Sequence, residues 1–432
     1  STSMVRTGSS VRFWLWAPLK TMKKLILVES EMKFPKGHFL DNLIESTYTF
    51  KNKFKIFWFL NKKFQQQGTF VPKEANILKV IESNFFKRKE NKVLYILEEI
   101  IIFIINFYYL FYYSFVFRKV FKKYFFALRS NFFLLPKYFR SFYPNYKNLN
   151  LMSTDHILFQ TSRRKDIALV NFLTKLDENH PIFHLRLMMP PTDRFKGFYY
   201  YLKQIDKELI KKKIYIYVWS NHNKKLLIKN SLSKKGIEQS SIPWSFQKKN
   251  YKSKNYTIGF IGDARKSRGF DLLIRLIEKL EKNKSKFNYI VQFSKIDADM
   301  IKMKKKLYEM SKKTNRLKIV EKYCDYREFR QILNKIDIMP IMHKAKEINR
   351  VTSGTMYSCL INEIPMVIPN GVTFMTKLLR FRSFEFAKNI DDFQKKLIKI
   401  SRNYKFYLNQ AKKNSSILKK KLTKDPLIKN IR

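Results

Sequence analysis

Cysteine, histidine and glycine are all scarce in this sequence of 432 residues. The two cysteines, Cys324 and Cys359, exclude a disulfide framework and a four-cysteine zinc site. Six histidines leave little room for dense histidine and cysteine ligation, so we expect no metal site. The ten glycines are about a third of the usual share of roughly 7%. Those that do occur are therefore informative about the backbone.

Acidic residues are also few, with 34 Asp and Glu against 88 Lys and Arg and a formal net charge of +54. Such a charge favours binding to phosphate, as nucleic acid, anionic lipid or nucleotide. Lys, Asn, Ile, Phe and Tyr are abundant together, however, and an AT-rich genome would produce the same bias on any solvated surface. The hydrophobic share of 45% excludes a wholly disordered chain.

The first 21 residues differ from the rest of the chain, since they hold Arg6, Arg12 and Lys20 but no acid. Met22 then begins a run that resembles a natural start leading into a buried strand. We interpret residues 1–21 as a leader or an upstream scar, disordered and outside the fold.

Short apolar runs alternate with stretches of helical spacing from Met22 onward. The runs cover 24–28, 56–60, 157–160, 182–187, 214–218, 257–261, 288–293, 317–320, 337–341 and 366–369. Strands that alternate with helices predict parallel sheets in an α/β fold. The polar stretch Ser245–Asn255 divides an N-terminal domain, 22–245, from a C-terminal domain, 256–385, and a basic helical tail occupies 386–432.

Residues 93–150 contain an unusual aromatic and basic segment. Ile100–Phe117 is interrupted only by Asn106 and Ser114, which is long enough to span a bilayer, and half of it is aromatic. Tyrosine favours the membrane–water interface, and one crossing would separate strands of the same sheet. We therefore predict an element at the surface of an anionic membrane. A buried helix of the first domain is the alternative, and a true span is the weakest reading.

The sequence Gly259-Phe-Ile-Gly262 to Gly269-Phe270 predicts a strand, a glycine turn, a basic loop and a helix. The glycine and lysine spacings fit neither a P-loop nor a dinucleotide fingerprint. Arg265 and Arg268 would lie at the C-terminal end of a parallel strand, where ligands of such sheets bind. Arginine binds phosphate bidentately, so the loop predicts an anion site, with a solvated basic loop as the alternative.

A second run, Thr352-Ser353-Gly354-Thr355, predicts a helix N-terminus with hydroxyl caps and a glycine that permits close approach of a ligand. The free amides of that helix end form a ready anion site. An ordinary helix cap is the alternative.

Together the two runs resemble the nucleotide-binding domain of GT-B glycosyltransferases, particularly the group 1, family-4-like class. The loop ending in Gly269 is similar to the family's basic loop, and Ile338–Ile341 is similar to its strand before the donor loop. Ser353–Pro365 resembles its Ser-Gly to Lys-Pro block, in which the ribose-contacting Glu falls on Ser358. More weakly, Gly37 and His38 look like its acceptor-side glycine loop.

The resemblance implies two Rossmann-like domains that face each other across a cleft. It also implies that Arg265, Arg268, Thr352, Ser353, Gly354, Thr355 and Ser358 hold the donor, and that Gly37 belongs to the acceptor-side loop. Among candidate acid–base groups we favour His38 over Asp155, His156, His180, His184 and His222. His184 alternates with apolar neighbours on a strand, which is typical of a structural histidine.

The predicted activity is a metal-independent hexosyl transfer from a nucleoside diphosphate sugar, with no bound cofactor, as part of polysaccharide biosynthesis. The predicted acceptor is a cell-envelope or lipid-linked glycan. We expect the protein to be cytoplasmic and peripheral at the inner face of the cytoplasmic membrane. Two alternatives stay open: a non-catalytic GT-B-like protein whose donor pocket has decayed at Ser358, and a basic nucleic-acid-binding protein. The continuous apolar run fits lipid better than nucleic acid, which we do not expect as a partner.

Overall fold

The computed structural model describes most of the chain outside the first residues and one long internal segment. The described residues are 22–30, 32, 38–65, 70–81, 135–187, 202, 205, 211, 213–219, 221–229, 236–240, 255–346, 348, 353–373 and 379–431. The expected leader, 1–21, and the apolar run Ile100–Phe117 lie outside them.

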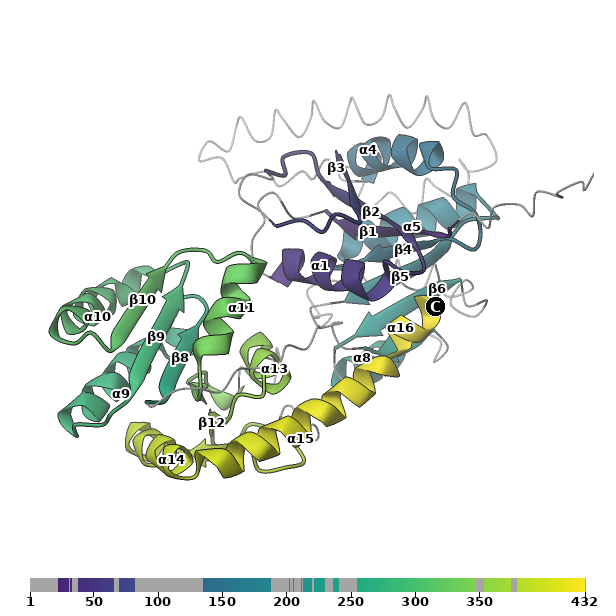
Figure 1. The fold of residues 1–432 in the computed structure, drawn as a ribbon. Helices are drawn as coiled ribbons and strands as arrows, with labels where there is room; N and C mark the ends of the chain where they lie inside the picture. The colour runs from purple at the N-terminus through teal and green to yellow at the C-terminus, as the bar shows by residue number, and fades with distance from the viewer. Residues whose placement is uncertain are drawn as a thin grey trace, which may run out of the picture.

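A seven-stranded parallel sheet forms the centre of the N-terminal domain, in the order β3-β2-β1-β4-β5-β6-β7 (Figure 1). Its strands are β1 (Lys24–Glu29), β2 (Lys55–Asn61), β3 (Ala75–Ile81), β4 (His156–Phe159), β5 (Ile182–Leu187), β6 (Ile214–Val218) and β7 (Ile237–Gln239). The order changes direction between β1 and β4. In such sheets ligands bind at the carboxyl ends of the two strands that flank this point.

Helices cover both faces of this sheet. They are α1 (His38–Phe50), α4 (Leu135–Asn148), α5 (Arg164–Leu176) and α8 (Asn221–Lys229). Alternate side chains of β1 enter different cores, because successive residues of a strand point to opposite faces. Leu25 and Leu27 pack in the core that includes α1, whereas Ile26 and Val28 pack in the core that includes α4 and α5.

Helix α4 is the last part of the segment for which a membrane-surface element was predicted. Its rings Tyr138, Phe139, Phe142 and Tyr146 are buried in the domain core. Residues 135–148 therefore form a covering helix of the sheet, while residues 93–134 of the predicted element lie outside the described part.

The C-terminal domain repeats the same topology. Its strands are β8 (Thr257–Ile261), β9 (Asn288–Phe293), β10 (Leu317–Glu321), β11 (Met339–Pro340), β12 (Met366–Pro369) and β13 (Phe384–Ala387). A bridge between Ile258 and Ile338 joins its two three-stranded parts, so the full order is β10-β9-β8-β11-β12-β13. The switch point lies between β8 and β11. Both sheets confirm the predicted pair of Rossmann-like domains.

Helices α9 (Phe270–Lys282), α10 (Ile301–Lys313), α11 (Tyr326–Lys335) and α13 (Gly354–Ile361) connect these strands. Helix α9 buries Leu273, Leu276 and Leu280 at helical spacing. Helix α11 begins with a capping box, in which Asp325 accepts from the Glu328 amide and Glu328 accepts from the Asp325 amide. This box fixes where α11 starts, immediately after β10.

The C-terminal tail connects the two domains. Helix α14 (Ile390–Arg402) packs in the C-terminal core, and α15 (Tyr404–Thr423) then runs toward the N-terminal domain (Figure 1). Helix α16 (Pro426–Ile431) packs there beside α1. The Ser240 hydroxyl donates to Asp425 at 2.6 Å, and the Asn430 amide donates to the Tyr217 hydroxyl at 3.1 Å. The tail therefore packs against both domains.

The domains also meet directly between α1 and α11. Glu45 on α1 is buried and accepts hydrogen bonds from the Tyr326 hydroxyl, at 2.5 Å, and from Arg330. Among the described residues, no helix is both long and apolar enough to cross a membrane.

Candidate functional site

The carboxyl ends of β8 and β11 bring together four residues, Gly262, Arg265, Arg268 and His343, which we call the switch-point cluster. The first three come after β8 and the last comes after β11. These two strands flank the switch point of the C-terminal sheet. The cluster therefore occupies the place where doubly wound sheets bind their ligands.

Glycine at position 262 allows Arg268 to fold back over the loop. Gly262 has a φ of 126°, and a Cβ built there would lie 2.2 Å from Nη1 of Arg268. Any side chain would therefore displace the guanidinium. Arg268, which the sequence predicted as a phosphate ligand, therefore packs against the backbone of Gly262.

A second glycine brings the β8 loop against the β11 loop. Gly269 has a φ of 73°, and a Cβ at this position would approach the Met342 carbonyl oxygen to 2.3 Å. Since His343 is next to Met342 in the chain, this close approach places the two halves of the cluster side by side.

The two arginines differ in their partners. Arg265 forms an ion pair with Asp263 at 2.8 Å and lies 3.9 Å from Asp297. Arg268 is half-buried, and no carboxylate of the described residues lies within ion-pair distance of it. Burial, opposed by the charge of Asp263, lowers its pKa. Within the described part of the chain, Arg268 is thus a partly desolvated cation without an anion, a state that a bound phosphate would stabilise.

His343 was not among the histidines considered from the sequence. Burial and the positive charge of Arg268 lower its pKa to about 4, so the ring is neutral at pH 7. Its Nδ1 atom is buried and has no hydrogen-bond partner among the described residues. A neutral imidazole with an unused nitrogen can exchange a hydrogen bond with a ligand beside Arg268. The sequence signal that could have identified His343 is its position directly after the predicted strand 337–341.

The N-terminus of α13 forms the third part of the predicted donor site. The Ser353 hydroxyl accepts from the Met356 amide at 3.3 Å, and a Cβ on Gly354 would meet nothing within 4 Å. The helix start is therefore open at Gly354, at the sheet edge that β11 leaves. Ser358 is buried one turn further along. Thr352 lies outside the described residues.

On the acceptor side, α1 begins at His38, but Gly37 and the His38 side chain lie outside the described part. Asp41 occupies the first turn of α1. Burial, followed by the charge of Glu45, raises its pKa to about 7 against the opposing effect of Arg330. A carboxyl group that titrates near neutrality is suited to proton transfer.

Tyr323, which follows β10, is half-buried and lies near charges of both domains. Burial raises its pKa, and the negative charges of Asp41 and Asp263 add to the effect. Asp41 belongs to α1 and Asp263 to the β8 loop, so negative charges from both domains act on the Tyr323 hydroxyl. The first turn of α1 and the β8 loop are therefore both close enough to Tyr323 to raise its pKa.

The other candidate groups of the first domain have structural partners. Asp155 accepts from the Lys24 and Met152 amides at 2.7 and 2.8 Å. His156 and His184 share a hydrogen bond of 2.9 Å, and His184 contacts the Tyr217 hydroxyl at 3.0 Å. The ring of His180 contacts the Pro181 carbonyl. The side chain of His222 is not described. In the described part of the chain, no three metal-ligating side chains gather.

The sequence matches no protein-family model and no curated protein. Solved structures do match along nearly the whole chain. HepE from Anabaena in complex with UDP-glucose is 9% identical, with a TM-score of 0.53 over 91% of this chain and 94% of that one. Sucrose-phosphate synthase from Thermosynechococcus elongatus is 7% identical, with a TM-score of 0.53 over 92% and 94%.

A glycosyltransferase from Rickettsia africae is 13% identical, with a TM-score of 0.50 over 95% of this chain and 99% of that one. At these identities the likeness concerns the fold. The chain has the two-domain GT-B fold, and the resemblance stated from its sequence is confirmed at that level.

Proposed function

We propose that this protein transfers a hexosyl unit from a nucleoside diphosphate sugar to an acceptor held by its N-terminal domain. The observation that carries the proposal is Arg268, a half-buried cation without a carboxylate partner among the described residues, at the switch point of the C-terminal sheet. The open helix end at Gly354 lies at the same sheet edge and adds backbone donors. HepE, which shares the fold, was solved with UDP-glucose.

The proposed site neutralises the leaving diphosphate without a metal ion. Arg268 and the α13 amides provide positive charge where negative charge develops on the leaving group. Arg265, Thr352, Ser353 and Thr355 complete the donor-binding set, and Ser358 lies on the ribose side. His38 at the start of α1 remains our prediction for the catalytic group on the acceptor side.

The proposed acceptor is a cell-envelope or lipid-linked glycan at the inner face of the cytoplasmic membrane. The aromatic run Ile100–Phe117 and the basic residues after it support this choice, since Ile100–Thr154 contains no acid.

Calorimetric titration of UDP and GDP tests the donor proposal. We expect one of them to bind, and chelation by EDTA to leave the affinity unchanged. If neither nucleotide binds at millimolar concentration, the enzyme assignment is wrong. The non-catalytic alternative, with a pocket that has decayed at Ser358, would then hold.

A further inference from the structure

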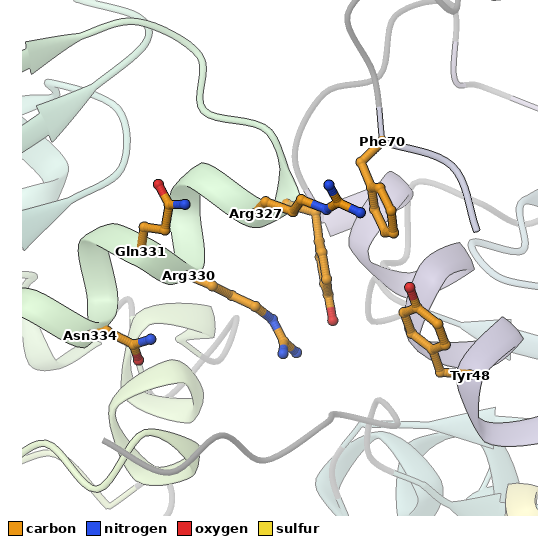
Figure 2. Close-up of a pocket in the computed structure, with 7 residues that line it drawn as sticks. Tyr48, Phe70, Arg327, Arg330, Gln331 and Asn334 are labelled. Carbon is orange, nitrogen blue, oxygen red and sulfur yellow. The ribbon is translucent and has the colours of Figure 1, made fainter. Parts of the chain in front are cut away.

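A cavity lies between the domains, apart from the switch-point cluster. It measures about 400 Å³, which lies within the range of small-molecule sites. Tyr48 of α1 and Phe70 line it from the N-terminal domain, and Tyr326, Arg327, Arg330 and Gln331 line it from α11. In Figure 2, Arg327 and Arg330 extend from α11 toward the side that carries Phe70 and Tyr48.

Cations cover the aromatic rings of this cavity. The Arg327 guanidinium lies 3.9 Å from the centroid of Phe70, and the Arg330 guanidinium lies 4.3 Å from that of Tyr326. The Lys51 ammonium lies 5.3 Å from the centroid of Tyr48. Phe70 and Tyr326 also stack on each other, at 6.2 Å and 16°. A flat nucleobase would need a free ring face, and a cation occupies one face of each of these rings.

The positive charges of the cavity are only partly neutralised. Arg330 pairs with buried Glu45, and Lys51 pairs with Glu74 at 2.7 Å. Arg327 is exposed, and no described carboxylate lies within ion-pair distance of it. The cavity thus offers one guanidinium whose charge-assisted hydrogen bonds remain available to an anion.

The remaining lining groups are suited to hydroxyl groups. Gln331 lies one helical turn after Arg327, and Asn334 one turn after Arg330, so all four project from one side of α11. Amides both donate and accept hydrogen bonds, as sugar hydroxyls do. The volume also exceeds what a bare phosphate or carboxylate would fill.

We propose that this cavity binds an acidic sugar unit, one that carries a carboxylate or a phosphate group. Arg327 and Arg330 hold the anionic group, and the amides of α11 hold the hydroxyls. Because both domains line the cavity, an occupant also bridges them.

The role of this unit rests on the proposed function, in which α1 belongs to the acceptor side. Tyr48 lies seven residues after Asp41, about 10 Å along the helix. When an acidic sugar of the acceptor glycan binds in this cavity, the adjoining sugars of the glycan lie near the start of α1. The acceptor class is then an acidic glycan.

Ligand-detected NMR on the full chain tests the site, with glucuronate, glucose 6-phosphate, glucose and inorganic phosphate as probes. We expect at least one of the two acidic sugars to bind, and which of them does distinguishes carboxylate from phosphate. Glucose and inorganic phosphate should bind at least about tenfold more weakly, because each offers half of the recognised chemistry. If glucose binds as well as the acidic sugars, or phosphate as well as glucose 6-phosphate, the inference is wrong.

Arg327→Ala locates the binding. It should weaken acidic-sugar binding about tenfold or more, because it removes the uncompensated guanidinium. Arg275→Ala removes an exposed arginine of α9 and is the matched control, with no expected effect. Binding of UDP or GDP should be equal in all three proteins. Failure of the parent to bind either nucleotide overturns the donor proposal alone, whereas acidic-sugar binding that survives Arg327→Ala overturns this site alone.

Discussion

Arg265 and Arg268 are close in the sequence but have different electrostatic surroundings. Arg265 already pairs with Asp263, so a diphosphate would have to compete with that carboxylate. Arg268 has no such competitor among the described residues. Arg268→Ala should therefore weaken UDP binding about ten- to a hundredfold, the worth of one charge-assisted contact. Arg265→Ala should weaken it less.

Calorimetric titration of UDP into both variants measures this order. Arg275→Ala on the exposed side of α9 controls for the loss of one positive charge. Equal losses in both variants would show that Asp263 does not compete with the ligand, and the difference argued from its ion pair would be wrong.

Asp41 makes the stability depend on pH. Its pKa is raised from 3.8 to about 7, by burial first and by Glu45 next. Between these values the folded protein keeps a proton that the unfolded chain releases, so stability falls as pH rises from about 4 to about 7. The side chain of the Asp41→Asn variant cannot ionise, so the variant should not lose stability over this pH range. Urea unfolding at pH 5 and pH 8 should show a larger gain for the variant at pH 8. Parallel pH curves for the two proteins would contradict the raised pKa.

For single residues, the sequence predicted where a side chain lies in the fold better than it predicted which groups that side chain contacts. Arg265 and Arg268 were found because a glycine turn came after a strand, but the ion pair to Asp263 depends on how the loop closes. His343 was missed because it is a lone histidine in a polar loop. Only the close approach at Gly269 shows that it lies beside Arg268.

Among the elements, the strands that were predicted and those that were missed differ in burial. All ten predicted runs form strands, from β1 to β12, and most of them are continuously apolar. The three missed strands, β3, β7 and β13, each end a described sheet. Their burial alternates or breaks, as at Glu385 and Phe386 within β13. An edge strand needs no continuous apolar run, so it is less distinct in the sequence.

Glu385 ties β13 to the two tail helices. Burial raises its pKa, but hydrogen bonds from Tyr407, Lys399 and Arg382 outweigh burial and lower the pKa to about 2. The stabilisation is present above about pH 4.5 and is lost as pH falls toward 2. Glu385→Gln should cost about 3 kcal/mol at pH 7 and much less near pH 3.

Urea unfolding at both pH values measures the cost of this substitution. Asp391→Asn is the matched control, because it removes the exposed ion pair with Lys279 and should cost at most about 1 kcal/mol. Equal costs for the two substitutions at pH 7 would show that burial of Glu385 does not matter.

The segment expected at the membrane surface can be tested through its charge. Replacing Lys119, Lys122 and Lys123 by Glu reverses three positive charges. At about 1 kcal/mol per basic residue near an anionic surface, binding should fall by orders of magnitude. Co-sedimentation with anionic vesicles measures it, with Lys302, Lys305 and Lys312 of α10 replaced as the control. A variant that sediments like the parent would contradict electrostatic attachment.

In the described part of the molecule, two of the connections that hold the domains together are the tail and the contact between α1 and α11, beside the contacts of Phe70 with Arg327 and of Trp219 with Tyr357. One is the tail, whose helix α16 packs in the N-terminal domain while α14 packs in the C-terminal one. The other is the contact of Glu45 with Tyr326 and Arg330. The tail contact combines the apolar side chains of α16 with the hydrogen bonds of Asp425 and Asn430, whereas the second contact depends on the buried carboxylate of Glu45. The domain arrangement should therefore respond to substitutions at Glu45 without unfolding either domain.

Glu45→Ala should loosen the domains, because it removes the acceptor of both the Tyr326 hydroxyl and the Arg330 guanidinium. Arg330 would remain largely buried without an acid, and such an uncompensated charge is costly enough to favour solvent exposure. Small-angle X-ray scattering should show a larger radius of gyration for the variant, with unchanged secondary structure by circular dichroism. Glu74→Ala, which removes the exposed pair with Lys51 inside one domain, should leave the scattering unchanged. If UDP reduces the difference in radius of gyration between Glu45→Ala and the parent, donor binding itself brings the domains together. If Glu45→Ala scatters like the parent without ligand, the hydrogen bonds of Glu45 do not hold the domain arrangement.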